Sequence, residues 1–414
     1  MLRSNPQEGM EGYAGIMQVR LKLFLGAAMA MCAVAVMGQG GDHIEFQADG
    51  TATEFMEGGG VIKRYSGHVI ARSADMELKA DEAVYDSKLN LTRLYGNTRL
   101  RDSVRTLYAD TLIYYDRLRR AIARGNVRGF ERARTIRAGQ VVYERGRRLL
   151  TGTGGVTIRD DSLRSSATGM SMVLNDSTRN GLVIGMPSLV REDKQGSIIT
   201  LTAADTLRIF DKERSAEMWN TVEVKKDSMT ARSLRAFYSD GDERVTLVGK
   251  PVIENIMHGE GDEDKVPIRI TSIVTGDTVY VYLKDRALTA VRIIGAAAGT
   301  TVAVDSAGAV YYRSVLESRG MRMDMDNNQI SLITAEGNAN SYYQHAATKK
   351  GRNMFVNTAR GDTIRLLFEN GGIADMRIRG LNSGDAVGKY YEFTPTKTAA
   401  DSAKEEKDTA AEPR

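Results

Sequence analysis

Residues 108–127, YADTLIYYDRLRRAIARGNV, contain two short apolar–polar alternations separated by a charged turn, and they end in a Gly-Asn-Val step. An alternation with a period of two is typical of a half-buried β-strand. Gly125 lacks a Cβ atom and can relieve crowding where a strand bends or bulges. The stretch therefore predicts a strand, a turn, a second strand and a corner.

The same skeleton returns at a spacing of 29 residues. Four positions keep this spacing: Ala80, Ala109, Ala138 and Ala167; Gly67, Gly96, Gly125 and Gly154; Tyr85, Tyr114, Tyr143 and Met172; and Val69, Thr98, Val127 and Val156. Agreement at four positions indicates duplicated strand–turn–strand units. Because so short a unit cannot bury its own apolar face, neighbouring units must stack.

Towards the C-terminus the repeat becomes longer. Gly276-Asp277 and Gly361-Asp362 stand 85 residues apart, and a copy midway between them gives a period of about 43 residues. We predict an all-β, extended, solenoid-like fold of stacked antiparallel strands, with the shorter repeats over residues 43–180 and a second β repeat region over residues 181–393. Residues 394–414 are charged and low in complexity, which predicts a disordered tail.

The composition agrees with an all-β chain of 414 residues. There are 41 Gly and only 6 Pro, and the net charge of +4 is too small to identify a partner. Many glycines with few prolines favour numerous strands punctuated by bends. Cys32 is the only cysteine, and it lies in a segment that we expect to be removed, so disulfides do not hold the mature chain together.

The N-terminal region predicts export. Arg20 and Lys22 precede an uncharged, mostly apolar run of fifteen residues that ends at Met37. This matches the charged and apolar regions of a signal peptide. We expect residues 1–38 to be cleaved, with Met17 as the true start. The alternative is a retained membrane anchor, although a span needs about 20 apolar residues.

The sequence contains no recognisable catalytic constellation, and we predict that the protein is not an enzyme. The four histidines are scattered without metal-ligand spacing, so neither a metal nor a cofactor is expected. Asp81, Asp110 and Asp205 occupy one repeat position. We interpret them as solvated carboxylates flanking strands, because another copy has Gly139 there.

Apolar residues occur on both parities of the predicted strands. An antiparallel sheet needs only one apolar face to close a core, so the second could line a groove for an apolar ligand. The pattern alone favours a simple sandwich core over a groove. If there is a groove, its lining is predicted to be Leu78, Ala80, Val84, Leu107, Ala109, Ile113, Val127, Ile136, Ala138 and Val142.

Arginine is concentrated in residues 93–164, which contain seventeen Arg and no Lys against seven Asp or Glu. Arginine binds phosphate and carboxylate with two parallel hydrogen bonds. An anionic lipid or glycan is therefore one expected partner, whereas nucleic acid is not expected for an exported protein. A solvated face that discourages aggregation is the other interpretation.

The combination of a signal peptide with ADEAVYD, LYGNTRLRDSVRTLYADTLIYYD and ARGNVRG resembles the OstA-like family. That family includes lipopolysaccharide transport protein A and the N-terminal domain of the outer-membrane translocon subunit. The resemblance covers residues 43–180 and recurs more weakly to residue 393. It implies a β-jelly-roll or "β-taco" fold.

The resemblance also implies a periplasmic bridge that carries lipopolysaccharide towards the outer membrane, with the lipid A acyl chains in an apolar groove. Family members join end to end, so it further implies a head-to-tail homo-oligomer, or pairing with similar β domains of lipopolysaccharide-transport proteins. The edges concerned would lie near DHIEFQADG and GKYYEFTP. The chain is about twice the length of the small bridge protein, and it lacks the barrel domain of the translocon subunit.

Two other functions stay open on the sequence alone. One is a scaffolding β-repeat protein of the cell envelope without lipid transport, which predicts a filled core. The other is an enzyme on a β-solenoid that acts on acidic polysaccharide, which requires clustered acids on one face. A transport bridge instead predicts a continuous apolar groove.

Overall fold

The computed structural model describes most of the chain between residues 44 and 393. The described residues are 44–56, 59–73, 75–192, 196–210, 212, 214–260, 266–284, 287–326, 329–345, 354–369, 372–380 and 387–393. The predicted signal segment, residues 1–38, and the predicted tail, residues 394–414, lie outside them.

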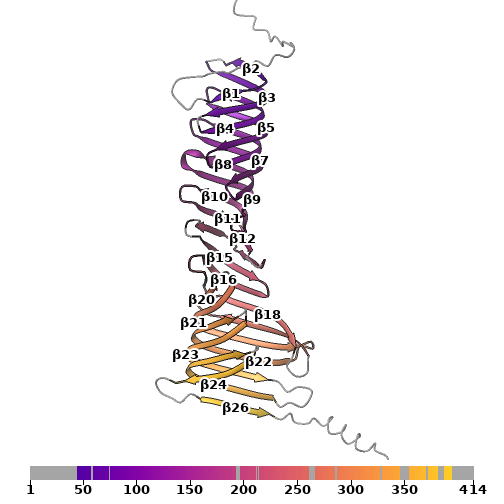
Figure 1. Cartoon of the computed structure of the whole chain (residues 1–414), viewed down its shortest axis with the longest axis vertical. Helices are drawn as coiled ribbons and strands as arrows, with labels where there is room; N and C mark the ends of the chain where they lie inside the picture. Colours follow the sequence, from indigo (N-terminus) through magenta and orange to yellow (C-terminus); the bar gives the residue numbers. More distant parts are fainter. Residues whose placement is uncertain are drawn as a thin grey trace, which may run out of the picture.

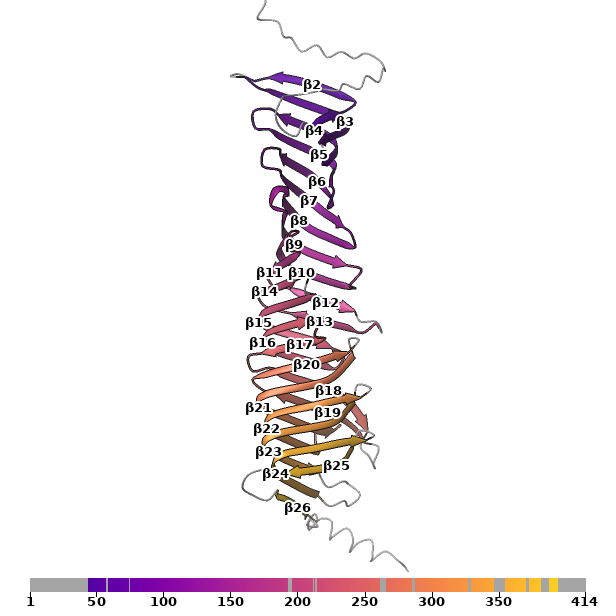
Figure 2. The same cartoon turned by 60° about the vertical axis from the view of Figure 1, so that its left-hand side comes forward.

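Within the described residues, 26 strands form one antiparallel sheet that is stacked into a long column (Figures 1 and 2). The only helical element among them is the short 3₁₀ turn η1 (Arg145–Arg147). The predicted all-β, extended fold of stacked antiparallel strands is therefore confirmed.

The strands of the upper part of the column are β1 (Glu45–Gln47), β2 (Gly50–Phe55), β3 (Val61–Ser73), β4 (Met76–Asp86), β5 (Leu91–Asp102), β6 (Thr106–Tyr115), β7 (Arg120–Glu131), β8 (Arg134–Glu144), β9 (Leu149–Asp160), β10 (Ser165–Asn175), β11 (Asn180–Ile184), β12 (Ser188–Glu192) and β13 (Ile198–Thr202). Those of the lower part are β14 (Thr206–Phe210), β15 (Ser215–Lys226), β16 (Met229–Ser239), β17 (Arg244–Val248), β18 (Val252–Glu260), β19 (Pro267–Thr275), β20 (Thr278–Lys284), β21 (Ala287–Asp305), β22 (Val310–Asp326), β23 (Gln329–His345), β24 (Met354–Glu369), β25 (Gly372–Arg379) and β26 (Val387–Phe393).

Each long strand of the upper column bends at a corner and contributes to two walls. In β6, residues 106–109 belong to wall A and residues 111–115 to wall B, and the pairing with β5 and β7 shifts register between the two halves. One row of turns joins the free ends of wall A, and a second row joins those of wall B. We call the space between these two rows the mouth. One 29-residue repeat is thus a pair of bent strands.

The corners explain why Gly-Asn and Asp recur at the same positions of successive repeats. Gly125 has a φ of 74°, a left-handed conformation that favours glycine. The side-chain amide of Asn126 donates to the carboxylate of Asp110 across the corner at 2.9 Å. A Cβ atom at Gly125 would collide with this carboxylate. Where Gly139 takes the place of aspartate, Gly154 lies against it instead.

Apolar ladders run down the inner face of each wall. The wall A ladder consists of Ala71, Leu78, Leu100, Leu107, Gly129, Ile136, Ile158, Ala167, Leu189, Leu201, Val224, Ala231 and Ile253. The wall B ladder consists of Tyr85, Thr92, Tyr114, Ala121, Tyr143, Leu150, Leu174, Gly181, Ile209, Ala216, Tyr238 and Val245. Leu78, Leu100 and Leu107 are at most 1% exposed, so side chains fill the interior at these levels.

The fourth copy of the repeat is displaced by two residues from the position that the 29-residue spacing predicts. Ala167 pairs with Ile158, which pairs with Ile136, so Ala167 takes the place of Ile136 rather than that of Ala138. The cause is the turn from β9 to β10, which has four residues, whereas the turn from β7 to β8 has two. Leu174, not Met172, consequently occupies the wall B position of Tyr143.

The sheet continues without a break past residue 180, because β10 pairs with both β11 and β12. From β11 to β14 the corner separates the two halves of each bent strand. β15 and β16 cross the corner as single strands, β17 to β20 are divided at it in the same way as β11 to β14, and β21 to β24 cross it as single strands of 16 to 19 residues. Gly295 and Gly337 mark these later corners with φ values of 73° and 80°. A repeat of the second region is therefore a pair of longer bent strands.

Candidate functional site

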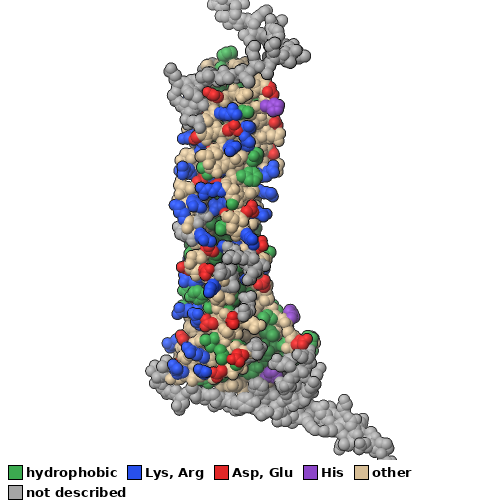
Figure 3. Space-filling model, in the orientation of Figure 1, with side chains coloured by type: hydrophobic (Ala, Val, Ile, Leu, Met, Phe, Trp, Pro, Cys, Tyr) green, Lys and Arg blue, Asp and Glu red, His purple; other side chains and the backbone are tan. Residues whose placement is uncertain are grey.

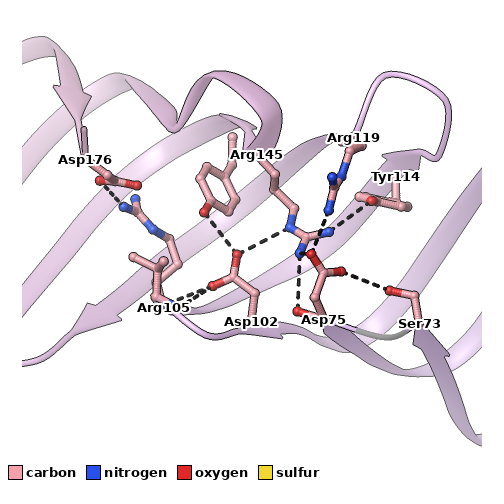
Figure 4. A network of polar contacts seen from close by, with 10 residues as sticks. Ser73, Asp75, Asp102, Arg105, Tyr114, Arg119, Arg145 and Asp176 are labelled. Carbon is pink, nitrogen blue, oxygen red and sulfur yellow. Dashed lines mark hydrogen bonds and ion pairs between the residues drawn. The ribbon is translucent and has the colours of Figure 1, made fainter. Parts of the chain in front are cut away.

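Ion pairs close the mouth in the upper half of the column. Asp102, at the wall A end of β5, accepts a hydrogen bond from the Tyr143 hydroxyl at 3.0 Å and pairs with Arg145 at 3.4 Å (Figure 4). Arg145 also pairs with Asp75 at 2.7 Å and donates to the Tyr114 hydroxyl at 3.3 Å. The contacts of Asp102 and Asp75 join the free edge of wall A to wall B, whereas the contact between Arg145 and Tyr114 lies within wall B.

Arg105 makes the most deeply buried of these links. Its guanidinium forms an ion pair with Asp176 and a second one with Glu131 at 3.2 Å. It also lies 4.6 Å from the centre of the Tyr143 ring, a distance that suits a cation–π interaction. The Arg105 side chain is only 1% exposed. We call the set Asp102, Arg105, Tyr143, Arg145 and Asp176 the upper clasp.

Ionisation of the neighbouring groups favours the closed mouth. The hydrogen bond from Arg145 lowers the pKa of Asp75 below its ordinary value. Burial raises the pKa values of Tyr114 and Tyr143, so both hydroxyls stay protonated and able to donate. Burial lowers the pKa of Arg145, but its hydrogen bonds to Asp75 and Tyr114 outweigh this, and the net pKa is raised.

A second set of contacts closes the mouth further down. Arg191 pairs with Asp240 at 3.2 Å and donates to the Tyr238 hydroxyl at 2.6 Å. Burial tends to raise the pKa of Asp240, but the hydrogen bond from Tyr238 and the charges of Arg191 and Arg214 outweigh it, so the net pKa is lowered. We call Arg191, Tyr238 and Asp240 the lower clasp.

Both clasps use a tyrosine of the wall B ladder. Tyr114 and Tyr143 anchor the upper contacts, and Tyr238 anchors the lower ones. Between Tyr143 and Tyr238 the wall B ladder contains Leu174 and Ile209, which have no hydroxyl that could bind a cation or a carboxylate. The mouth is therefore open where the tyrosines are interrupted.

A cavity of about 550 Å³ occupies this interruption, which we call the opening. Its apolar lining comes from both walls and includes Ile158, Ala167, Leu174, Leu189 and Ile209. Ala167 and Gly181 are the small members of the two ladders at this level. Because both are small, the walls leave space here that larger side chains fill in the repeats above.

The rim of the opening carries more positive than negative side chains. The cations are Arg132, Arg134, Arg179, Lys212 and Arg214, and the acids are Glu131, Asp160 and Asp176. All three acids are paired with arginines: Glu131 and Asp176 with Arg105, and Asp160 with Arg134 at 3.0 Å. Arg132 and Lys212 are exposed, and neither forms an ion pair with another described residue. The rim is thus suited to an anion.

The residues predicted to line a groove lie elsewhere. Seven of them are buried in the filled core: Leu78, Ala80, Leu107, Ala109, Val127, Ile136 and Ala138. The inward orientation predicted for Val84, Ile113 and Val142 is wrong, because each is half-buried and the residue before it is the buried one: Ala83, Leu112 and Val141. None of the ten lines the opening.

The parity error has a physical cause at the corner. Asp81 and Glu82 are both exposed, so two successive side chains point outwards where β4 bends. The register of β4 against β5 shifts at this point. Inward positions therefore change parity from wall A to wall B, which a uniform alternation cannot predict.

Sequence reasoning missed the apolar residues of the opening. The interrupted tyrosine spacing at the fourth copy was a signal, since Met172 followed Tyr85, Tyr114 and Tyr143 in that column. The two-residue slip concealed which residue, Leu174, replaces the tyrosine in space.

Many arginines of residues 93–164 serve the fold. Arg105, Arg134 and Arg145 pair with acids along the mouth. Figure 3 shows basic side chains spread along the column and interleaved with acidic ones. On the face shown they form no single basic patch.

No protein-family model matches the sequence, and no curated protein matches it either. Among the described residues, no three His, Cys, Asp or Glu side chains gather in a way that could hold a metal ion. None of the helices in that part of the chain is long and apolar enough to cross a membrane.

Proposed function

We propose that the protein is a periplasmic lipopolysaccharide-binding bridge, and that acyl chains engage the opening between the two clasps. The observation that carries this proposal is the pairing of an apolar lining with a cationic rim in one opening of the column. Such a site matches an amphiphile whose acyl chain is buried and whose phosphates meet arginine and lysine. The predicted signal peptide and the resemblance to the OstA-like family support the same location and ligand.

The ends of the column support assembly with similar domains. At the N-terminal end β1 and β2 pair only with β3, and at the other end β25 and β26 pair only with β24, among the described strands. Each end therefore offers unpaired backbone groups to a further strand. A head-to-tail homo-oligomer, or a lipopolysaccharide-transport protein with a similar β domain, would extend the column.

A scaffolding role without lipid transport is the second candidate, and a specific observation favours it. The interior is filled from Ala71 to Ile136, and the upper clasp closes the mouth beside it. At these levels the described repeats therefore have no open apolar groove, so no apolar groove runs continuously through the described column.

Photo-crosslinking separates the two candidates. A photoreactive amino acid at Leu174, in the opening, should capture lipopolysaccharide in cells, whereas one at Thr168, exposed next to Ala167, should not. Replacing Ala167 with Leu narrows the opening. If it excludes even two methylenes, it should weaken capture by about tenfold, since each buried methylene contributes about 0.8 kcal/mol. The matched control is Thr168→Leu. Equal capture from Leu174 and Thr168 would support the scaffolding role.

A further inference from the structure

The free volume at the mouth is bounded on both sides. Towards the N-terminus, Tyr143 and Leu150 fill the wall B ladder and are at most 2% exposed. Towards the C-terminus, the contact of Arg191 with Tyr238 and Asp240 closes the mouth again. The opening is thus a compartment of limited length.

The size of this compartment limits what it can hold. Its volume of about 550 Å³ falls within the range of about 300–1,000 Å³ that is typical of sites for one small molecule. A lipid A molecule carries several acyl chains, and accommodating all of them would require the packed levels above Ile136 to separate. Those levels contain Leu78, Leu100 and Leu107 with almost no exposure.

The charges at the rim specify the other end of the ligand. The acids of the rim are already neutralised by Arg105 and Arg134, whereas Arg132 and Lys212 stand exposed beside the apolar lining. A single anionic head group would meet these cations while its chain lies against Leu174, Leu189 and Ile209. A neutral head group would gain nothing from them.

We propose that the opening binds one single-chain anionic amphiphile, such as a fatty acid or a lysophospholipid, with a stoichiometry of one ligand per chain. The inference rests on the proposed function in treating the opening as a lipid site, but it does not require lipopolysaccharide to be the ligand. Ala167 and Gly181 set the width of the apolar part, and Arg132 and Lys212 bind the head group.

Native mass spectrometry and equilibrium binding with palmitate, lysophosphatidic acid and the neutral analogue hexadecanol test this assignment on the full chain. Palmitate and lysophosphatidic acid should each bind once. Hexadecanol should bind about tenfold more weakly, because it lacks the charge that Arg132 and Lys212 stabilise. Ala167→Leu should weaken binding by about tenfold or more, whereas Thr168→Leu should leave it unchanged. Lys212→Glu should weaken it, whereas Arg128→Glu on the outer face should not.

Several results would overturn the assignment: two or more ligands per chain, no effect of Ala167→Leu, or equal affinity for hexadecanol and palmitate. The outcome is separable from that of the proposed function. Lipopolysaccharide captured at Leu174 without palmitate binding would refute only this inference. Palmitate bound once without lipopolysaccharide capture would refute only the proposed bridge.

Discussion

Arg105 and Asp176 form an ion pair across the mouth although 71 residues separate them in the chain. Asp75 and Arg145, which are 70 residues apart, meet in the same way. The strands are inclined to the long axis of the column (Figure 2), so the free edge of wall A lies level with wall B residues of a later repeat. Side chains thereby tie together repeats that are not neighbours in sequence.

The first prediction concerns this buried pair. Asp176→Ala removes one of the two carboxylates that balance the charge of the buried Arg105 guanidinium. It should therefore lower the free energy of unfolding by about 3 kcal/mol. Removing both charges with Arg105→Met and Asp176→Ala should cost less than the sum of the single changes. Denaturant unfolding measures both quantities. The exposed pair of Arg147 and Glu144 is the control, and its removal should cost no more than about 0.5 kcal/mol. Additive effects at Arg105 and Asp176 would contradict the coupling.

The second prediction concerns acid pH. Because Arg145 lowers the pKa of Asp75 below its unfolded value of 3.8, the pair stabilises the fold above that pH, and the stabilisation is lost as pH falls through the lower folded pKa. The wild type should therefore exceed Arg145→Met in stability most clearly above about pH 4, with the difference narrowing in stronger acid. Thermal unfolding across this range measures it. A difference that widens in acid would exclude the ion pair as the cause.

The third prediction concerns the corners. Gly125→Ala places a Cβ atom at a positive φ and against the Asp110 carboxylate, and should cost about 1–3 kcal/mol. Combining it with Asp110→Gly should recover part of the loss, because the Gly139 corner lacks the carboxylate. Gly146→Ala is the control, since nothing lies within 4 Å of its added Cβ atom. Unfolding experiments compare the three, and no recovery in the double variant would rule out the steric explanation.

The fourth prediction concerns assembly through the column ends. Proline at Ala52 in β2 or at Tyr391 in β26 removes a backbone donor from an end strand and should reduce head-to-tail oligomers. Sedimentation velocity at several concentrations measures oligomer size, and circular dichroism checks that each variant keeps its sheet. If both variants form oligomers of the wild-type size, the ends are not the site of association.

The sequence by itself determined the all-β class, the 29-residue repeat and the corner glycines. These features are local, since alternation specifies strands and a missing Cβ atom permits positive φ at Gly125. The 29-residue spacing also showed the repeated tyrosines, of which Tyr143 belongs to the upper clasp and Tyr114 contacts its Arg145.

Only the tertiary structure decided which side chains face inwards beyond each corner and where the mouth opens. The inward parity changes at Asp81 and Glu82, because the bend adds an outward residue. The longer turn before β10 moves Leu174 into the tyrosine ladder. The pairing of Arg105 with Asp176 depends on the inclination of the strands. Each of these results from how distant segments align in space, which no spacing along the chain specifies.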